Sequence, residues 1–234
     1  FTGGLVDFQK AIFSGGDTYF DEAKFDGGNA LFSRVNFSGG DANFKRTRFD
    51  GGSAAFDYVK FSGGDAYFVD AHFTGGGASF FNAQFDNVSS FFEAKFRKYS
   101  YFTGAAFKGP ISLIDSHFAV VPDFRQTAFT MHFTCDGIKV AYIVDEEREW
   151  GLFRKAYSST DADKFRRLKE LAVQARDHER EQDFFAKELK AKRFYETTGL
   201  SLIPSYLYEW TSDFGRSLWR PILCLGLTWL IFGM

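Results

Sequence analysis

The stretch Phe61-Ser-Gly-Gly-Asp-Ala-Tyr-Phe68-Val-Asp-Ala-His72 decides the fold of this 234-residue chain. It is one copy of a 12-residue unit, F-x-G-G-x-A-x-F-x-x-A-x, in which phenylalanines alternate at spacings of seven and five. A fixed short period is typical of solenoids, because one unit buries too little to be stable and stacked units build a continuous core. The repeat therefore predicts a solenoid.

The unit continues in both directions from this copy. It is already in phase at Phe1, so we expect further residues upstream. Beyond Phe85 it shortens to eleven residues and runs to Phe129, with Leu113 in one phenylalanine position. The predicted ladder consists of Phe8, Phe13, Phe20, Phe25, Phe32, Phe37, Phe44, Phe49, Phe56, Phe61, Phe68, Phe73, Phe80 and Phe85.

The size of one coil follows from the alternation of the two spacings. A small residue stands two positions before almost every ladder phenylalanine, as Ala66 does before Phe68, and strand geometry points both inward. Identical residues stack only if a coil holds whole units, so a coil has 12 or about 24 residues. Two walls could hardly enclose the rings of a 12-residue coil at normal packing density. We predict four walls with one phenylalanine each and five to six coils, a rod about 25 Å long.

Glycine pairs such as Gly63-Gly64 occur only in the seven-residue spacer. We expect them at a wide corner, where at least one adopts positive φ and any Cβ would clash with neighbouring coils. The alternative is a phosphate-binding loop. It is disfavoured because neither a strand-to-helix context nor a Gly-Lys-Ser/Thr sequence follows.

This pattern resembles the pentapeptide-repeat family, whose units read A-[DN]-[LF]-x-x. The resemblance covers about residues 1–129 and implies a right-handed quadrilateral β-helix; the inserted Gly-Gly departs from it by lengthening every second wall. The predicted fold class is thus mainly β, with this solenoid over residues 1–130. An α-helical hairpin and a C-terminal membrane helix are expected to follow.

The period changes after the solenoid. Residues 131–159 lose it and are predicted to form a cap and linker. Over residues 160–198, one apolar stripe from Phe165 and another from Phe184 predict two antiparallel helices of about 15 residues each. Ten Lys/Arg and nine Asp/Glu stand in mixed order across 160–196. They indicate a solvated face, with an oligomer interface as the alternative.

The last part of the chain is apolar. Over residues 199–217, steps of three and four from Leu200 to Leu218 through Phe214 predict an amphipathic helix at a headgroup layer, although a buried soluble helix would show the same stripe. No charge follows Arg220, and the fourteen residues from Pro221 span about 21 Å of a roughly 30 Å hydrocarbon core. We predict that 218–234 begin a transmembrane helix that continues beyond Met234, rather than a buried hairpin. The predicted membrane-interface residues are Tyr206, Tyr208, Trp210, Arg216, Trp219 and Arg220.

The charged strings around Phe165-Arg-Arg-Leu-Lys169 and Phe184-Phe-Ala-Lys-Glu188 resemble the helical connector of bacterial pentapeptide-repeat membrane proteins. Some of those proteins continue into a two-helix, potassium-channel-like pore, but no T-V-G-Y-G-type filter stands in this sequence. The resemblance implies the bacterial inner membrane. Because the cations precede the apolar segment, the positive-inside rule predicts the solenoid on the cytoplasmic side.

The sequence shows no catalytic or metal-binding pattern. His72, His117, His132 and His178 lack partners at metal-ligand spacing, and no nucleophile–base pair stands out. The carboxylate pairs Asp21-Glu22 and Glu146-Glu147 are expected on solvated turns. Cys135 and Cys224, the only cysteines, favour a reducing compartment over a disulfide framework. The sequence predicts neither an enzyme nor a cofactor.

The predicted function is a non-enzymatic cytoplasmic scaffold or assembly platform of an integral membrane protein, with the cytoplasmic domain of a channel-like protein as one form. The expected partners are the lipid bilayer and either a second copy or another membrane protein. The alternative is a soluble DNA mimic that binds topoisomerases. Such a mimic needs one sign of charge, whereas residues 1–130 carry 14 Asp/Glu and 12 Lys/Arg. The overall net charge of -2 also gives no reason to expect nucleic acid as a partner.

Overall fold

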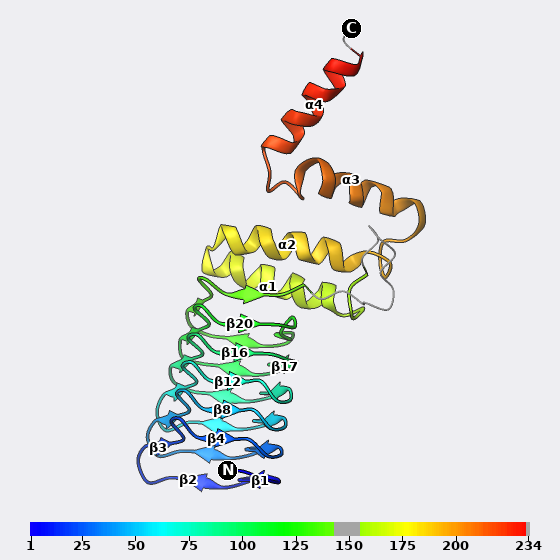
Figure 1. Ribbon diagram of the computed structural model, residues 1–234. Coiled ribbons are helices and arrows are strands. Elements are labelled where there is room, and N and C mark those ends of the chain that lie inside the picture. The colour runs from blue at the N-terminus through cyan, green and yellow to red at the C-terminus, as the bar shows by residue number, and fades with distance from the viewer. Residues whose placement is uncertain (143–154, 233–234) are drawn as a thin grey trace. The chain divides into compact units, whose positions relative to one another are not determined.

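The computed structural model describes residues 1–142 and 155–232 of the chain (Figure 1). The chain divides into two compact units, Phe1–Ile143 with Glu170–Asp177, and Val144–Lys169 with His178–Met234. Most of the first unit is a β-solenoid, and the second consists mainly of helices. The expected linker between 143 and 154, the pair Glu146-Glu147 and residues 233–234 lie outside the described residues.

The solenoid has four parallel sheets, which we call walls A to D in chain order. Wall A contains β1 (Val6–Asp7), β5 (Ala30–Leu31), β9 (Ala54–Ala55), β13 (Ala78–Ser79) and β17 (Ser100–Tyr101). Wall B contains β2 (Ile12–Phe13), β6 (Asn36–Phe37), β10 (Lys60–Phe61), β14 (Gln84–Phe85), β18 (Ala106–Phe107) and β21 (Ala128–Phe129). Wall C contains β3 (Thr18–Tyr19), β7 (Ala42–Asn43), β11 (Ala66–Tyr67), β15 (Ser89–Ser90), β19 (Ile111–Ser112) and β22 (Phe133–Thr134). Wall D contains β4 (Lys24–Phe25), β8 (Arg48–Phe49), β12 (His72–Phe73), β16 (Lys95–Phe96), β20 (His117–Phe118) and β23 (Lys139–Val140).

The strand register confirms the four-walled coil, in which every turn holds two repeat units. Phe61 pairs with Phe37 and with Phe85, its equivalents one coil before and one coil after. Farther along, Phe85 pairs with Phe107, although the repeat has shortened between them. Each half-coil therefore loses one residue when the Gly-Gly spacer shortens, and the stacks continue through the change.

Four columns of phenylalanine fill the interior. Phe44, Phe56, Phe68 and Phe80 are each fully buried, as predicted for the ladder. Phe44 stacks on Phe68 with centroids 4.9 Å apart, and Phe56 stacks on Phe80 at 5.0 Å. The two columns meet edge to face, with Phe56 and Phe68 at 5.4 Å and 89°. Both arrangements are favourable for aromatic quadrupoles, so the core is ordered by ring geometry as well as by burial.

Three ladder residues of the first coil are less enclosed. Phe8, Phe13 and Phe20 are partly exposed, whereas their partners one coil on, Phe32, Phe37 and Phe44, are buried. Burial at each ladder position thus depends on a coil on both sides.

The expectation that Gly63 or Gly64 adopts positive φ is wrong. Positive φ occurs at Gly3, Gly4 and Gly16, but at none of the stacked pairs from Gly27 to Gly76. These positions require glycine because there is no room for a side chain. A Cβ on Gly63 would lie 2.7 Å from the carbonyl carbon of Gly39 in the preceding coil. Glycine is needed here because two backbones approach too closely for any side chain.

Residues with positive φ lie at the other, tighter corners of the coil, and most of them are not glycine. They recur every twelve residues, for example at Arg46, Tyr58 and Asp70, where φ is 55°, 56° and 49°. The Ala71 N–H donates to the carbonyl of Phe68 at 3.2 Å, closing a β-turn around Asp70. Residues with positive φ are thus concentrated where side chains face outward and have room.

A polar ladder runs beside the glycine pairs. The Asp65 N–H donates to Asp41 Oδ1 at 2.8 Å, and the Asp41 N–H donates to Asp17 Oδ1 at 2.9 Å. A Cβ on Gly64 would collide with the Asp41 carboxylate that makes this contact. Gly40, Gly52 and Gly64 thus each leave space for a side chain, that of Asp17, Asn29 or Asp41, which satisfies a backbone N–H of the next coil.

The predicted cap and linker over residues 131–159 is wrong for residues 131–140, which continue the solenoid. Strands β22 and β23 extend walls C and D, pairing Ile111 with Phe133 and His117 with Lys139. The inward positions Cys135 and Val140 are buried and stand eleven residues after Phe124 and Phe129. The period continues here, but smaller apolar residues replace phenylalanine and hide it.

The helical part begins with the two helices expected from the apolar stripes, α1 (Asp161–Ala175) and α2 (His178–Lys192). Phe165 and Leu168 on α1 and Phe184 on α2 are buried. A short 3-10 turn, η2 (Gly199–Ser201), leads into α3 (Leu202–Ser212), and α4 (Trp219–Phe232) follows.

Candidate functional site

The most unusual surface of the second unit is α4, whose apolar side chains are exposed on every side. No charged residue stands between Pro221 and Phe232. Leu225 is 70% exposed and Trp229 is 73% exposed. The other exposed large apolar residues of this helix are Trp219, Ile222, Leu223, Leu227, Leu230 and Ile231. Such a contiguous apolar surface marks a site for a membrane or a protein partner.

The N-terminal end of α4 is defined by local sequence. Ser217 Oγ accepts the Arg220 N–H at 3.3 Å, which satisfies one of the free N–H groups of the first turn. Pro221 follows in that turn, where its missing N–H costs nothing. The helix therefore starts at Trp219, just before the proline.

Helix α3 adds a second group of exposed apolar side chains. Ile203, Leu207 and Trp210 lie at helical spacing and are all exposed, and Leu200 precedes them on η2. They are the first four members of the predicted amphipathic stripe. Within the second unit they extend the exposed apolar surface beyond α4.

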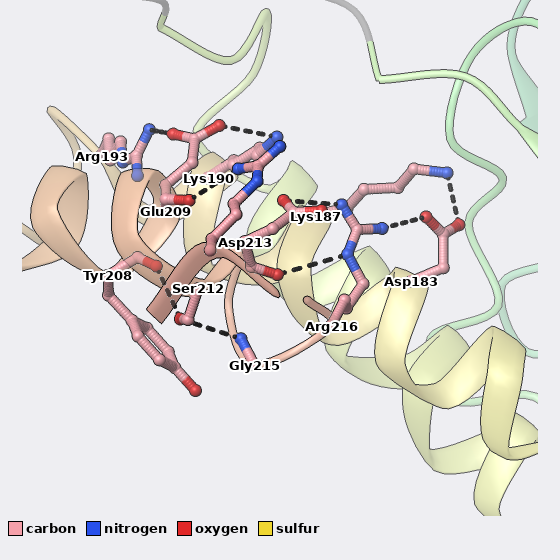
Figure 2. A network of polar contacts seen from close by, with 11 residues as sticks. Asp183, Lys187, Lys190, Arg193, Tyr208, Glu209, Ser212, Asp213, Gly215 and Arg216 are labelled. Carbon is pink, nitrogen blue, oxygen red and sulfur yellow. Dashed lines mark hydrogen bonds and ion pairs between the residues drawn. The ribbon is translucent and has the colours of Figure 1, made fainter. Parts of the chain in front are cut away.

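The stripe does not continue to Phe214 as one helix, which corrects the prediction for 199–217. Asp213, Phe214 and Gly215 all have positive φ and end α3. The Gly215 N–H donates to Ser212 Oγ at 3.1 Å, and that hydroxyl donates to the Tyr208 carbonyl at 2.9 Å (Figure 2). This tight turn separates α3 from α4.

Phe214 is buried instead of extending the exposed stripe. Its ring meets Tyr208 edge to face at 5.5 Å. The Arg193 guanidinium and the Lys190 ammonium lie 5.4 Å and 5.7 Å from its centroid, within cation–π range. The turn after α3 is thereby packed against α2.

Ion pairs join α3 and its following turn to α2. Glu209 on α3 contacts Lys190 at 2.8 Å and Arg193 at 2.5 Å (Figure 2). Burial raises the pKa of Glu209, but hydrogen bonds from Lys190 and Arg193 outweigh it and hold the pKa below its ordinary value. Within this network the carboxylate stays ionised near neutral pH.

A second group of contacts holds the turn. Arg216 lies 3.1 Å from Asp183 and 3.0 Å from Asp213, and Lys187 shares Asp183 at 2.6 Å (Figure 2). Arg193 also donates to Ser205 Oγ at 2.9 Å and to its carbonyl at 2.8 Å. The contacts of Arg216 hold the turn between α3 and α4, and those of Arg193 to Ser205 hold the first half of α3.

Part of the charge predicted to be solvated is buried. Glu188 is only 2% exposed and contacts Lys169 at 2.6 Å, Lys192 at 2.7 Å and Arg166 at 3.0 Å. Burial raises the pKa of Glu188, but the hydrogen bonds from these three cations outweigh it and lower the pKa. The mixed charges of α1 and α2 therefore do more than solvate a surface, because one of them is a hub between the two helices.

The six predicted interface residues differ in what their side chains contact. Tyr208, Trp210 and Trp219 are exposed. Tyr206 lies under the Arg193 guanidinium at 4.0 Å, Arg216 joins the ion pairs above, and Arg220 donates to the Glu209 carbonyl at 3.1 Å. Arg216 and Arg220 are exposed as well, so five of the six present side chains to the surroundings, and Tyr206, Arg216 and Arg220 also make contacts at the junction.

The sequence did not indicate that Glu188, Arg193 and Glu209 are hubs of ion pairs, although Glu188 and Arg193 belong to its charged strings. Their types are unremarkable among so many charges, and only the packing of α2 against its neighbours reveals them. The spacing of Glu188 and Lys192, four residues apart on one helix, was the one available signal.

No helix among residues 1–142 and 155–232 is both long and apolar enough to span a lipid bilayer. Over the same described residues, histidine, cysteine and carboxylate side chains form no group of three that could hold a metal ion. Glu22 pairs with Arg46 at 2.7 Å on the surface, and His72 contacts Asp70 at 3.1 Å.

Comparison with known proteins gives no match: no protein-family model matches the chain, and neither a curated protein nor a solved structure is significantly similar to it. The four parallel sheets, with two repeat units in every turn, are consistent with a pentapeptide-repeat-like fold.

Proposed function

We propose that this chain is a non-enzymatic scaffold in which the β-solenoid is a rigid platform and the apolar surface of α3 and α4 binds a lipid bilayer. We further infer that it is a divergent, right-handed member of the pentapeptide-repeat family. The observation that carries the membrane proposal is the exposure of α4, where Leu225, Trp229 and Ile231 face outward without one charged residue among them.

The physical argument is the cost of leaving that surface in water. Burying apolar area contributes about 25 cal/mol per Å², so a helix exposed on all sides gains most from an apolar phase that can surround it. A helix satisfies its own backbone hydrogen bonds, as hydrocarbon requires. A protein groove usually covers one face of a helix, whereas α4 has no polar face to leave uncovered.

The aromatic residues fit the same proposal. Trp210 and Trp219, with Tyr208, are exposed near the junction of α3 and α4. Tryptophan and tyrosine favour the headgroup layer, because they combine an apolar ring with a polar atom. Arg220 beside them would remain at the polar boundary.

The junction supplies the rigidity that a platform needs. Because Glu209 is bound by Lys190 and Arg193, and Arg216 by Asp183, the exposed helix α3 is fixed to α2 at several points. In the proposed role, a force on the membrane-bound helices would reach α2 through these contacts.

The side of the membrane is proposed from the resemblance, as the cytoplasmic face of a bacterial inner membrane. Cations that precede α4 agree with it, although Arg216, Lys190 and Arg193 are engaged by carboxylates. Partners beyond lipid would be a second copy or another membrane protein.

Vesicle flotation tests the proposal on the full chain. Wild type should float with neutral phosphatidylcholine vesicles, and Trp fluorescence should shift to the blue and be quenched by brominated acyl chains. The variant Leu223→Gln/Leu227→Gln/Leu230→Gln, which places three amides on α4, should stay at the bottom of the gradient.

The matched control is Leu5→Gln/Ile12→Gln/Met131→Gln, which changes three exposed apolar residues of the solenoid. It should float like wild type. The proposal is wrong if the α4 variant also floats, or if wild type remains unbound. A wild-type dimer in light scattering that ignores vesicles and disappears in the α4 variant would assign the surface to self-association instead.

A further inference from the structure

The outward side chains of wall D form a single basic column. In wall D the inward positions are phenylalanine and finally Val140, and the residue before each points outward. The strand register places these outward residues directly above one another. From the first coil to the last they are Lys24, Arg48, His72, Lys95, His117 and Lys139.

The column is not a consequence of the repeat itself. Wall B occupies the equivalent place in the other half of each coil, and its strands have the same outward-then-inward order. Only one of its six outward residues is basic. They are Ile12, Asn36, Lys60, Gln84, Ala106 and Ala128.

Such a column is electrostatically unfavourable by itself. Neighbours in a parallel stack lie roughly 4.8 Å apart, and like charges side by side destabilise a sheet. Two carboxylates offset this in the middle: Arg48 lies 2.8 Å from Asp50, and Asp70 lies 3.1 Å from both His72 and Lys95.

No carboxylate in the described part of the chain offsets the positive charge at the ends of the column. Lys24, His117 and Lys139 are exposed and form no ion pair within residues 1–142 and 155–232. Lys24 and Lys139 thus carry positive charge that no described carboxylate offsets, one at each end of the column, and an anionic surface outside the protein would stabilise both.

We propose that this basic column binds anionic lipid headgroups and is a second membrane-binding element of the solenoid. The inference rests on the proposed function. Stable attachment to a membrane usually takes two signals, an apolar anchor and a group of basic residues, and α4 supplies only the first. Each Lys or Arg near an anionic leaflet adds about fivefold in affinity.

A planar lipid surface fits the column better than a nucleic acid does. The four Lys and Arg side chains lie along one straight wall, and a bilayer presents headgroups along its whole length. A duplex backbone curves away from a straight row, and tight binding to it requires many neutralised phosphates. Asp50 and Asp70, which pair with Arg48 and Lys95 beside the column, reduce its attraction for so dense a polyanion.

The test compares two triple variants of the full chain with equal loss of charge. One is Lys24→Gln/Lys95→Gln/Lys139→Gln on the column. The control is Lys10→Gln/Lys60→Gln/Lys108→Gln elsewhere on the solenoid. Affinities are measured by flotation at low salt on vesicles of phosphatidylcholine alone and of phosphatidylcholine and phosphatidylglycerol mixed seven to three, and by anisotropy on a labelled DNA duplex.

Wild type should bind the anionic vesicles at least tenfold more tightly than the neutral ones. The column variant should lose most of that difference and keep its binding to neutral vesicles, while the control retains it. The inference is overturned if wild type shows no preference for anionic vesicles, if both variants lose it equally, or if the column variant loses only DNA binding. Failure of α4 as an anchor is distinguished from all of these, because wild type would then not bind neutral vesicles.

Discussion

Phe68 in the solenoid is surrounded by other phenylalanine rings, whereas Glu188 in the helical unit is surrounded by three cations. In the first region the apolar side chains are inside and charge is outside. In the second, ionised groups hold the helices together while the largest apolar surface, on α4, faces outward. The first region encloses its large apolar side chains, whereas the second leaves those of α4 exposed.

The difference shows how the two regions obtain specificity. A repeat places identical side chains at identical positions, so ring stacking and the backbone hydrogen bonds between coils fix the register together. Helices without a repeat need another means of fixing one arrangement, and hydrogen-bonded ion pairs with directional geometry provide it.

The largest effect should come from breaking the phenylalanine core. Phe68→Ala removes a fully buried ring and leaves a cavity among its neighbours, so we expect a loss of about 3–5 kcal/mol in the free energy of unfolding. Denaturant titration of wild type and variant measures it. Trp229→Ala on exposed α4 should change the same quantity by less than about 0.5 kcal/mol in solution. Equal effects would contradict the contrast between the two regions.

The close approach of coils should produce the next largest effect. Gly63→Ala forces a methyl group against the backbone of Gly39, and we expect a loss of about 3 kcal/mol. Gly15 is the matched control, because nothing lies within 4 Å of its Cβ position and its φ is not positive. Gly15→Ala should therefore be neutral or slightly stabilising. The same loss at both sites would exclude stacking as the reason for the glycines.

The buried ion pairs of the helical unit should matter somewhat less. Glu188→Gln keeps the shape of the side chain but leaves three cations without their anion, and we expect a loss of about 2 kcal/mol at neutral pH. Circular dichroism at 222 nm during denaturation follows the helices. Glu179→Gln, which removes an exposed carboxylate 3.7 Å from Arg180, should cost less than about 0.5 kcal/mol.

The pH dependence sharpens this prediction. The folded-state pKa of Glu188 lies below its ordinary value of 4.5, so the stabilisation is complete above that pH and is lost as the pH falls through the folded-state pKa. The difference between wild type and Glu188→Gln should therefore shrink in acid. A difference that is constant from pH 7 to pH 3 would show that the carboxylate charge is not the cause.

The smallest effect should come from the surface of the solenoid. Arg46 and Glu22 form an ion pair at 2.7 Å, but both side chains are largely exposed. Glu22→Gln should change the unfolding free energy by less than about 0.5 kcal/mol, and the difference should vanish in concentrated salt. A larger value in the same denaturant titration would mean that polar contacts also stabilise the first region.

The failures of prediction are as instructive as the successes. Residues 131–140 belong to the solenoid but were assigned to the cap and linker of 131–159. Cys135 and Val140 occupy positions that phenylalanine fills in earlier coils, although both keep the eleven-residue step. The glycine pairs were placed correctly at corners, but positive φ was assigned to them and not to residues such as Arg46 and Asp70. A pattern of residue types reports spacing reliably and backbone conformation less so.

The sequence by itself determined the four walls, the coil length and the inward phenylalanine columns, because each depends on a period that one chain displays along its length. It also determined that the residues after Arg220 carry no charge. Only the tertiary structure decided which charges are buried, where α3 ends at Asp213, and that the stacked glycines do not adopt positive φ. Those properties depend on contacts between residues on successive coils or on different helices, where no local rule distinguishes one lysine or glutamate from the next.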